Sequence, residues 1–187
     1  MVTIGTGTKI FSSGFDLVDW APDWNRMKTS IPHFHEVMAR LLEFPMPTLC
    51  VYNGKALAGG CIFGLSHDLR IMNEQTGSIC LSEILIGLPL TPPYMSLVAA
   101  KLEPKIALKA SYAFTFNVED ALKDKMIDDK YSGQKDLESK ISGFANRFAQ
   151  FGVFREAIKT NKTNQYRETI ELCRATKSLD VPLSKIL

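Results

Sequence analysis

Short apolar runs separated by turns fill the first half of the chain. The segments at 48–52 (TLCVY), 69–73 (LRIMN) and 78–80 (SIC) have the length and composition of buried strands. The opening segment at 1–7 (MVTIGTG) predicts a further short strand that runs into a glycine turn. Residues 59–68 (GGCIFGLSHD) predict a short buried helix between two of these strands.

One helix is expected before the first of the central strands. Apolar residues recur at three- and four-residue intervals from Ser30 to Phe44, which is the spacing of one helix face. Ser30 is a suitable cap, and Pro32 is tolerated because it falls in the first turn. Pro45 and Pro47 end the predicted helix.

The second half of the chain has a different pattern. Long helical patterns dominate residues 95–187, among them 134–150 and 153–176, where apolar residues lie on one face and Lys and Glu elsewhere. No repeat or low-complexity linker divides the sequence. We therefore expect one domain over residues 1–187, with strand–helix units in 1–94 and a helical region in 95–187.

Composition narrows the class of protein. A length of 187 residues with 45% hydrophobic content suits one globular domain with a sizeable core. The net charge of +2 is too small to indicate nucleic-acid binding, and no apolar run approaches the roughly 20 residues of a membrane span. Cys50, Cys61 and Cys80 lie in apolar runs, which predicts reduced core thiols in a soluble intracellular protein. No signal or transit sequence is recognisable at the amino terminus.

Two glycine-containing segments could supply backbone N–H donors. The run at 58–61 (AGGC) follows a strand and opens a helix, so its first N–H groups suit a phosphate, a carboxylate or an oxyanion. It lacks the spacing of a nucleotide-binding loop. If this run is considered alone, the favoured interpretation is that Gly59 and Gly60 only allow the helix to pack tightly against a sheet. Residues 11–17 (FSSGFDL) repeat the arrangement, with Asp16 more plausible as a helix cap than as an acid.

Together the two loops suggest a two-donor oxyanion hole. Ordinary turn chemistry is the alternative for Ser12 and Ser13. Glu83 is the third candidate, because it stands alone in an apolar run where desolvation would raise its pKa toward that of a general base. The alternative is a glutamate that points outward from an edge strand.

The histidines give weaker signals. His67 and Asp68 are adjacent in sequence, and neighbours in sequence rarely face one another, so both are interpreted as structural. His33 and His35 have no third ligand nearby, and no metal site is expected.

Four segments, in order, resemble the enoyl-CoA hydratase/isomerase (crotonase) superfamily. They are residues 11–17 (FSSGFDL), 47–60 (PTLCVYNGKALAGG), 68–71 (DLRI) and 83–88 (EILIGL). The segment at 82–94 (SEILIGLPLTPPY) most resembles the peroxisomal enoyl-CoA delta isomerases of the plant type. The resemblance implies an α/β spiral of ββα units, followed by a helical region that builds trimers. It also implies that the N-terminal part of the spiral is missing, so that the chain is a fragment or a shortened homologue.

The resemblance assigns roles to particular residues. The N–H groups of Phe15 and Gly59 would form the oxyanion hole, and Glu83 would be the catalytic base. Lys9, Ser13 and Leu17 fall on positions that line the coenzyme A site.

Two positions distinguish among the reactions of the superfamily. The first of the two hydratase glutamates, which follows the glycine run, is replaced by Ile62, and the aspartate of the dienoyl isomerases is replaced by Thr91. The expected reaction is therefore isomerisation of 3-enoyl-CoA to trans-2-enoyl-CoA in fatty-acid β-oxidation, with no cofactor besides the acyl-CoA substrate. A non-catalytic acyl-CoA-binding subunit and another reaction, such as hydration, are the alternatives.

The C-terminal sequence SKIL departs from the peroxisomal signal SKL. The expectation that the protein lies in the peroxisome therefore rests on the resemblance alone, and the mitochondrion is the alternative location.

Overall fold

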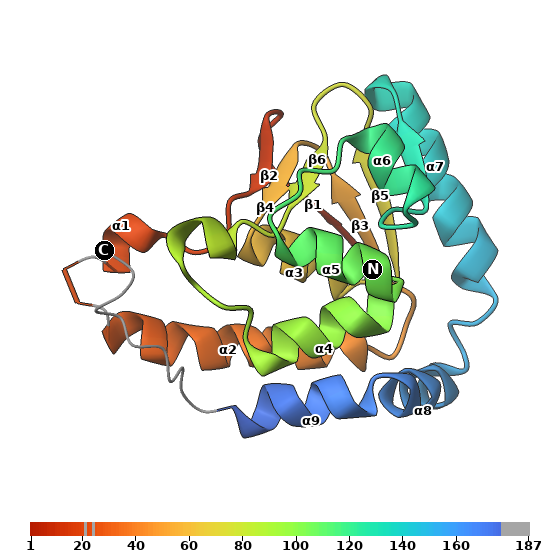
Figure 1. Ribbon diagram of the computed structural model, residues 1–187. Helices are drawn as coiled ribbons and strands as arrows, with labels where there is room; N and C mark the ends of the chain where they lie inside the picture. Colours follow the sequence, from red (N-terminus) through yellow and green to blue (C-terminus); the bar gives the residue numbers. More distant parts are fainter. Residues whose placement is uncertain (21, 24, 177–187) are drawn as a thin grey trace.

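Two small parallel sheets form the centre of the protein (Figure 1). The computed structural model describes residues 1–20, 22–23 and 25–176. The first sheet has the strand order β1-β3-β5-β7 and the second the order β2-β4-β6. The strands are β1 Val2–Ile4, β2 Ile10–Ser12, β3 Leu49–Tyr52, β4 Lys55–Leu57, β5 Leu69–Asn73, β6 Ser78–Cys80 and β7 Asp129–Tyr131.

Successive strands alternate between the sheets, and this alternation creates a spiral. Each turn of the chain places one strand in each sheet and then crosses back through helical segments. All ladders are parallel, as helical crossovers require. The helical segments are α1 Leu17–Trp20, α2 Asn25–Leu42, α3 Gly59–Leu65, the 3₁₀ turn η1 Glu83–Ile86, α4 Pro92–Lys101, α5 Pro104–Ser111, α6 Val118–Lys123, α7 Gly133–Ala149, α8 Arg155–Gln165 and α9 Arg167–Ala175.

The strands and the short helix predicted from the apolar runs are confirmed. β3, β5 and β6 fall where the sequence placed them, and β1 pairs in parallel with β3, with Val2 opposite Leu49. The fold class, an α/β spiral followed by helices, is also confirmed. Strand β4 was not anticipated, because it has three residues of which Ala56 alone is fully buried.

The predicted boundaries of helix α2 were wrong. The helix begins at Asn25 and ends at Leu42, so Ser30 is not its cap and Pro32 lies in its interior. The Asp23 carboxylate accepts a hydrogen bond from the Asn25 N–H (3.0 Å), which favours the earlier start. Met27 in the added turn is buried, and its packing offsets the penalty of the internal proline.

The predicted helix 153–176 is two helices rather than one. Tyr166 separates α8 from α9 with non-helical angles (φ −109°, ψ 22°). Its hydroxyl lies 2.8 Å from the Lys101 ammonium, and its ring is buried. Lys162 of α8 is also buried and pairs with Asp68 at 2.8 Å. The Lys162–Asp68 pair attaches α8 to the spiral, and the Tyr166–Lys101 contact joins the bend between α8 and α9 to the end of α4.

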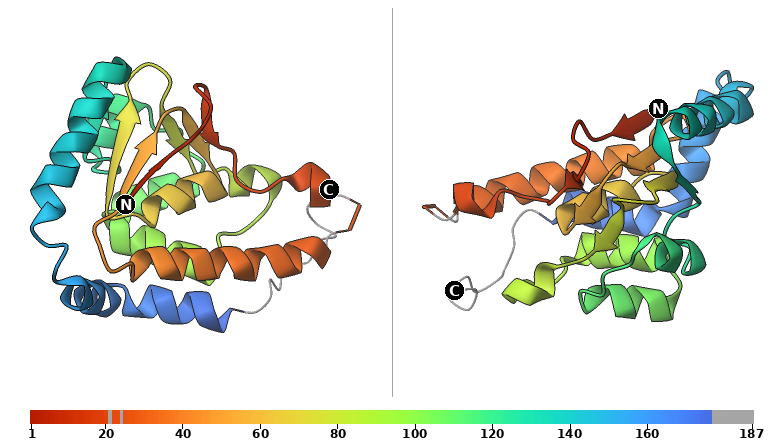
Figure 2. Two further views of the ribbon diagram at one scale, coloured as in Figure 1. Left: turned by 180° about the vertical axis from the view of Figure 1, so that it is seen from behind. Right: turned by 90° about the horizontal axis from the view of Figure 1, so that it is seen from above.

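The main core lies between the helices and the two sheets. Figure 2 shows α2 and α4 below the sheets, with α9 along their outer side.

All four cysteines are buried and unpaired, in agreement with the interpretation of Cys50, Cys61 and Cys80 as core thiols. Over the described residues, no helix has both the length and the apolar character needed to cross a membrane.

Candidate active site

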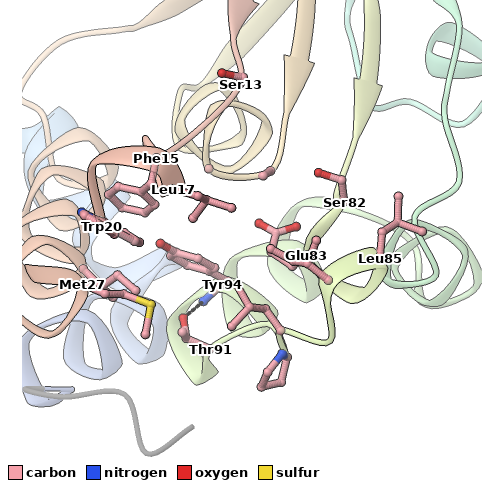
Figure 3. Close-up of a pocket in the computed structure, with 16 residues that line it drawn as sticks. Ser13, Phe15, Leu17, Trp20, Met27, Ser82, Glu83, Leu85, Thr91 and Tyr94 are labelled. Atoms are coloured by element: carbon pink, nitrogen blue, oxygen red, sulfur yellow. Dashed lines mark hydrogen bonds between the residues drawn. The ribbon is translucent and has the colours of Figure 1, made fainter. Parts of the chain in front are cut away.

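A cavity of about 340 Å³ opens where the two glycine loops meet η1 and the start of α4 (Figure 3). Its walls are mostly apolar and come from segments far apart in the sequence. The lining residues are Ser13, Phe15, Leu17, Trp20, Met27, Ile31, Ala58, Gly59, Ser82, Glu83, Leu85, Ile86, Leu88, Pro89, Thr91 and Tyr94.

The two glycine loops pack directly against each other. A Cβ atom on Gly60 would lie 2.4 Å from the Ser12 carbonyl oxygen, and one on Gly14 would lie 2.9 Å from the Gly59 nitrogen. Gly14 also has φ +86°, which only glycine adopts readily. Tight packing therefore explains these glycines, and it also brings Phe15 and Gly59 to the same cavity.

The amides of Phe15 and Gly59 both belong to residues that line the cavity. Neither the Phe15 nor the Gly59 N–H has an acceptor among the described residues. Ala58, which precedes Gly59, has the left-handed angle φ +48° and donates its own N–H to the Cys80 carbonyl (2.9 Å). A non-glycine residue in this conformation carries strain, and such strain often occurs at functional sites.

Glu83 lies inside the cavity, buried to 9% exposure. Its Oε2 atom has no hydrogen-bond partner, and burial raises the pKa of the carboxyl group above the ordinary value for glutamate. The alternative of an outward-pointing glutamate on an edge strand is wrong. Gly87, at φ +71°, closes the 3₁₀ turn η1, which turns Glu83 inward and leaves Leu85 72% exposed.

The structure brings together five of the six residues singled out from the sequence. Lys9 is the exception, because it is exposed in the turn before β2 and does not line the cavity. Asp16 caps α1, since its carboxylate accepts from the N–H groups of Val18 (3.1 Å) and Asp19 (3.0 Å). The five that line the cavity are Ser13, Phe15, Leu17, Gly59 and Glu83.

Sequence reasoning missed the aromatic wall of the cavity. The Phe15 ring packs on Trp20 (centroids 4.7 Å apart) and edge-on against Phe34 (5.3 Å). Phe34 in turn meets the Tyr94 ring at 5.9 Å. Aromatic residues in helices look like core residues in a sequence, so no local signal marked them.

His67 and Asp68 have structural roles. The His67 ring nitrogens lie 3.0 Å from the Phe63 carbonyl and 2.9 Å from the Thr3 hydroxyl, and burial lowers the pKa of the imidazole to about 4. Asp68 accepts from the Thr48 N–H at 2.8 Å and pairs with Lys162. Neither residue lines the cavity. Within the described parts of the chain, no group of three or more His, Cys, Asp or Glu residues could hold a metal ion.

Ile62 and Thr91, the two positions that distinguish the reactions, differ in location. Ile62 is fully buried in α3 and does not line the cavity. Thr91 lines the cavity and caps α4, with its hydroxyl 3.5 Å from the Tyr94 N–H. Glu83 is accordingly the one carboxylate that lines the cavity in the part of the chain that the structure describes.

Known proteins are similar to part of this sequence. Enoyl-CoA delta isomerase 3 from Arabidopsis thaliana is 42% identical over 112 residues, which is 57% of this chain and 46% of the relative. Peroxisomal enoyl-CoA delta isomerase 2 from the same plant is 39% identical over 109 residues, or 54% of this chain and 45% of the relative. The chain spans about half the length of the curated relatives it matches.

Solved structures share the fold. An enoyl-CoA hydratase from Mycobacterium ulcerans matches with a TM-score of 0.83 and 27% identity, over 94% of this chain and 76% of that chain. Human mitochondrial Δ3-Δ2-enoyl-CoA isomerase matches with a TM-score of 0.80 over 91% and 66% of the two chains, and at 19% identity this likeness concerns the fold alone. The enoyl-CoA hydratase/isomerase family model matches residues 1–177, and the chain therefore belongs to the enoyl-CoA hydratase/isomerase (crotonase) family.

Proposed function

We propose that this protein isomerises 3-enoyl-CoA to trans-2-enoyl-CoA. One observation carries the proposal: Glu83, whose buried Oε2 atom has no hydrogen-bond partner among the described residues, lines an apolar cavity together with Phe15 and Gly59, whose N–H groups have no acceptor among the same residues. A thioester substrate needs both features. The Arabidopsis relatives named enoyl-CoA delta isomerases support the assignment.

The two amides would bind the thioester oxygen. When a proton leaves C2, negative charge moves onto this oxygen, and N–H donors already in position stabilise the enolate. One such donor contributes roughly 10²–10³ in rate in other enzymes. Because the loops of Phe15 and Gly59 contact each other through glycines, we expect the spacing of the donors to be set before substrate binds.

Glu83 would move the proton. Its carboxylate removes a proton from C2 and returns it to C4 of the dienolate, so the double bond shifts by one carbon and no atom is gained or lost. The group must reach within about 3 Å of each carbon in turn. The apolar walls exclude water, and the raised pKa of the buried carboxyl makes it a stronger base than an exposed glutamate.

Isomerisation fits the cavity better than hydration. Water addition uses two carboxylates in the hydratases that the chain resembles, and the position of the first, after the glycine run, holds the fully buried Ile62. Thr91 stands where the dienoyl isomerases carry an aspartate, and its hydroxyl caps a helix.

We further propose that Ser13 and Leu17, which line the cavity, contact the coenzyme A portion, with Lys9 on the surface near its phosphates.

The experiment measures turnover and binding separately. Purified protein is assayed with a 3-enoyl-CoA by the absorbance of the conjugated product, and the binding of a saturated acyl-CoA is followed by calorimetry. Wild-type protein should turn over and bind, whereas Glu83→Gln should bind without turnover. Wild-type protein that binds acyl-CoA but never isomerises would instead indicate a non-catalytic binding subunit. An active Glu83→Gln variant would remove Glu83 from the mechanism.

Assembly and location are proposed on the resemblance and the relatives. We propose a trimer, and the exposed side chains of Phe151, Val153 and Phe154 between α7 and α8 are available for such contacts. Light scattering should give three times the chain mass of 20.9 kDa.

We propose the peroxisome as the location, since two Arabidopsis relatives are named peroxisomal. Mitochondrion is the alternative, because a rat relative is named mitochondrial. The C-terminal SKIL lies outside the described residues. Imaging of the protein fused at its N-terminus to a fluorescent tag tests the location.

A further inference from the structure

Lys101 is a partly buried cation that the isomerase mechanism does not use. It is the last residue of α4 and does not line the cavity. Its Nζ atom donates to the His67 carbonyl oxygen at 3.0 Å and to the Tyr166 hydroxyl at 2.8 Å. Burial lowers the pKa of the Lys101 ammonium to about 7, so holding a charge at this place costs free energy.

The carboxylates near this ammonium are paired with other cations. Asp68 pairs with Lys162 at 2.8 Å, and Asp128 lies 3.6 Å from the Arg70 guanidinium. The charges of Arg70 and Lys162 also act to lower the pKa of Lys101. A lysine among other cations, without a carboxylate of its own among the described residues, is not explained by ion pairing and calls for another role.

The contact with His67 joins the far ends of two helices that both begin at the cavity. Helix α3 begins at Gly59, and the turn that ends it leads to His67. Helix α4 follows Thr91, which lines the cavity, and ends at Lys101. Among the described residues, this is the hydrogen bond that joins α4 to α3 and its last turn.

Arg70 holds the same carbonyl from a different side. Its Nη1 atom donates to the His67 carbonyl oxygen at 3.0 Å, and its Nε atom donates to the Met126 carbonyl oxygen at 2.7 Å. Because Arg70 belongs to β5, it fixes the end of α3 to the first sheet. Lys101 then links α4 to an end of α3 that is already anchored.

We propose that Lys101 is a positioning residue that sets the distance between Glu83 and the amides of Phe15 and Gly59. The inference rests on the proposed function. The turn η1, which carries Glu83, and α4 are consecutive elements, so a shift of α4 moves the carboxylate. The amides stay in place, because Arg70 anchors α3 and the two glycine loops contact each other. A charged donor binds a carbonyl more strongly than a neutral one, which gives the cation its purpose here.

The test measures turnover and binding in variants of Lys101. Lys101→Met should lower kcat for a 3-enoyl-CoA about tenfold, because a misplacement of about 1 Å in a catalytic group costs on the order of 10²-fold and a smaller shift costs less. The Kd of a saturated acyl-CoA, measured by calorimetry, should stay within error of the wild-type value, since the amides do not move. Lys101→Arg keeps the cation and should restore most of the lost kcat.

Lys162→Met is the matched control. It also removes a lysine from this group of charges and should lower stability, but its ion pair is with Asp68 and not with α3 or α4. Its kcat should equal that of the wild type. Equal losses of kcat in Lys162→Met and Lys101→Met would overturn the inference, because stability alone would then explain both.

Hydrogen exchange tests the same link without substrate. Lys101→Met should speed amide exchange in α4 and leave α3 at the wild-type rate, whereas Lys162→Met should leave both helices unchanged. If Lys101→Met does not fold, Lys101→Gln, which has a neutral donor, must show the same loss of kcat and the same faster exchange. Unchanged exchange in α4, unchanged kcat, or a Kd that weakens as much as kcat falls overturns the inference.

The wild-type protein distinguishes the two failures. Turnover by the wild type that Lys101→Met does not lower would leave the proposed function standing and remove the positioning role. A wild type that binds acyl-CoA without turnover would contradict the proposed function, and the positioning role would fall with it.

Discussion

Gly14→Ala tests whether contact between the two glycine loops sets the spacing of the amide donors. The new methyl carbon would lie 2.9 Å from the Gly59 nitrogen and 3.2 Å from the Ala58 Cβ, so the loops must separate by a substantial fraction of an ångström. In addition, the left-handed φ of +86° costs a non-glycine residue about 1–2 kcal/mol.

The expected loss is larger in activity than in stability. Donors in an oxyanion hole act at 2.7–3.1 Å, and a misplacement of about 1 Å costs on the order of 10²-fold in rate. We therefore expect kcat/KM for 3-enoyl-CoA to fall about 100-fold, while the free energy of unfolding falls by about 1–2 kcal/mol. The measurements are a steady-state isomerase assay and urea unfolding at the same pH.

Gly133→Ala is the matched control for this substitution. Gly133 also has a positive φ, +71°, but nothing lies within 4 Å of the position that a Cβ would occupy. It should lose about the same 1–2 kcal/mol of stability and keep full activity. If Gly14→Ala keeps its activity, or if both variants lose activity equally, the loop contact does not set the catalytic geometry.

Three further predictions concern charge. Because burial raises the pKa of Glu83, kcat/KM should fall on acidification with an apparent pKa above the ordinary 4.5 of glutamate, and a profile that falls only below 4.5 would contradict this. The raised pKa also means that the native state binds this proton more tightly than the unfolded chain does, so stability declines as pH rises from the ordinary to the raised pKa. Glu83→Gln should therefore have a higher Tm than the wild type at pH 7. An equal or lower Tm would contradict this reasoning. Lys162→Met should lower the free energy of unfolding by about 1–3 kcal/mol, because it leaves the partly buried carboxylate of Asp68 without its cation. A free energy of urea unfolding within error of the wild-type value would show that the pair does not hold α8 in place.

The sequence was most informative where a local rule was broken. A lone carboxylate in an apolar run marked Glu83, because burying an unpaired charge is costly and such positions are usually functional. The glycines of the two loops were equally visible, since backbone that approaches backbone leaves no room for side chains. Their resemblance to a known family then joined segments that local patterns could not connect.

Other features could not be read because they depend on contacts distant in sequence. The early start of α2 rests on a cap by Asp23 and on burial of Met27, and periodicity alone did not reveal either. The break at Tyr166 follows from its contact with Lys101, 65 residues away. Trp20 and Tyr94 looked like ordinary core residues, and only the folded chain shows that they line a cavity.

The most direct test of the central claim is a crystal structure of the Glu83→Gln variant with a 3-enoyl-CoA bound. We expect the thioester oxygen to lie within hydrogen-bond distance of the Phe15 and Gly59 nitrogens, at about 2.7–3.1 Å. The side chain at position 83 should approach C2 and C4 of the acyl chain. A thioester bound elsewhere, or one whose oxygen contacts neither amide, would contradict the mechanism proposed for this protein.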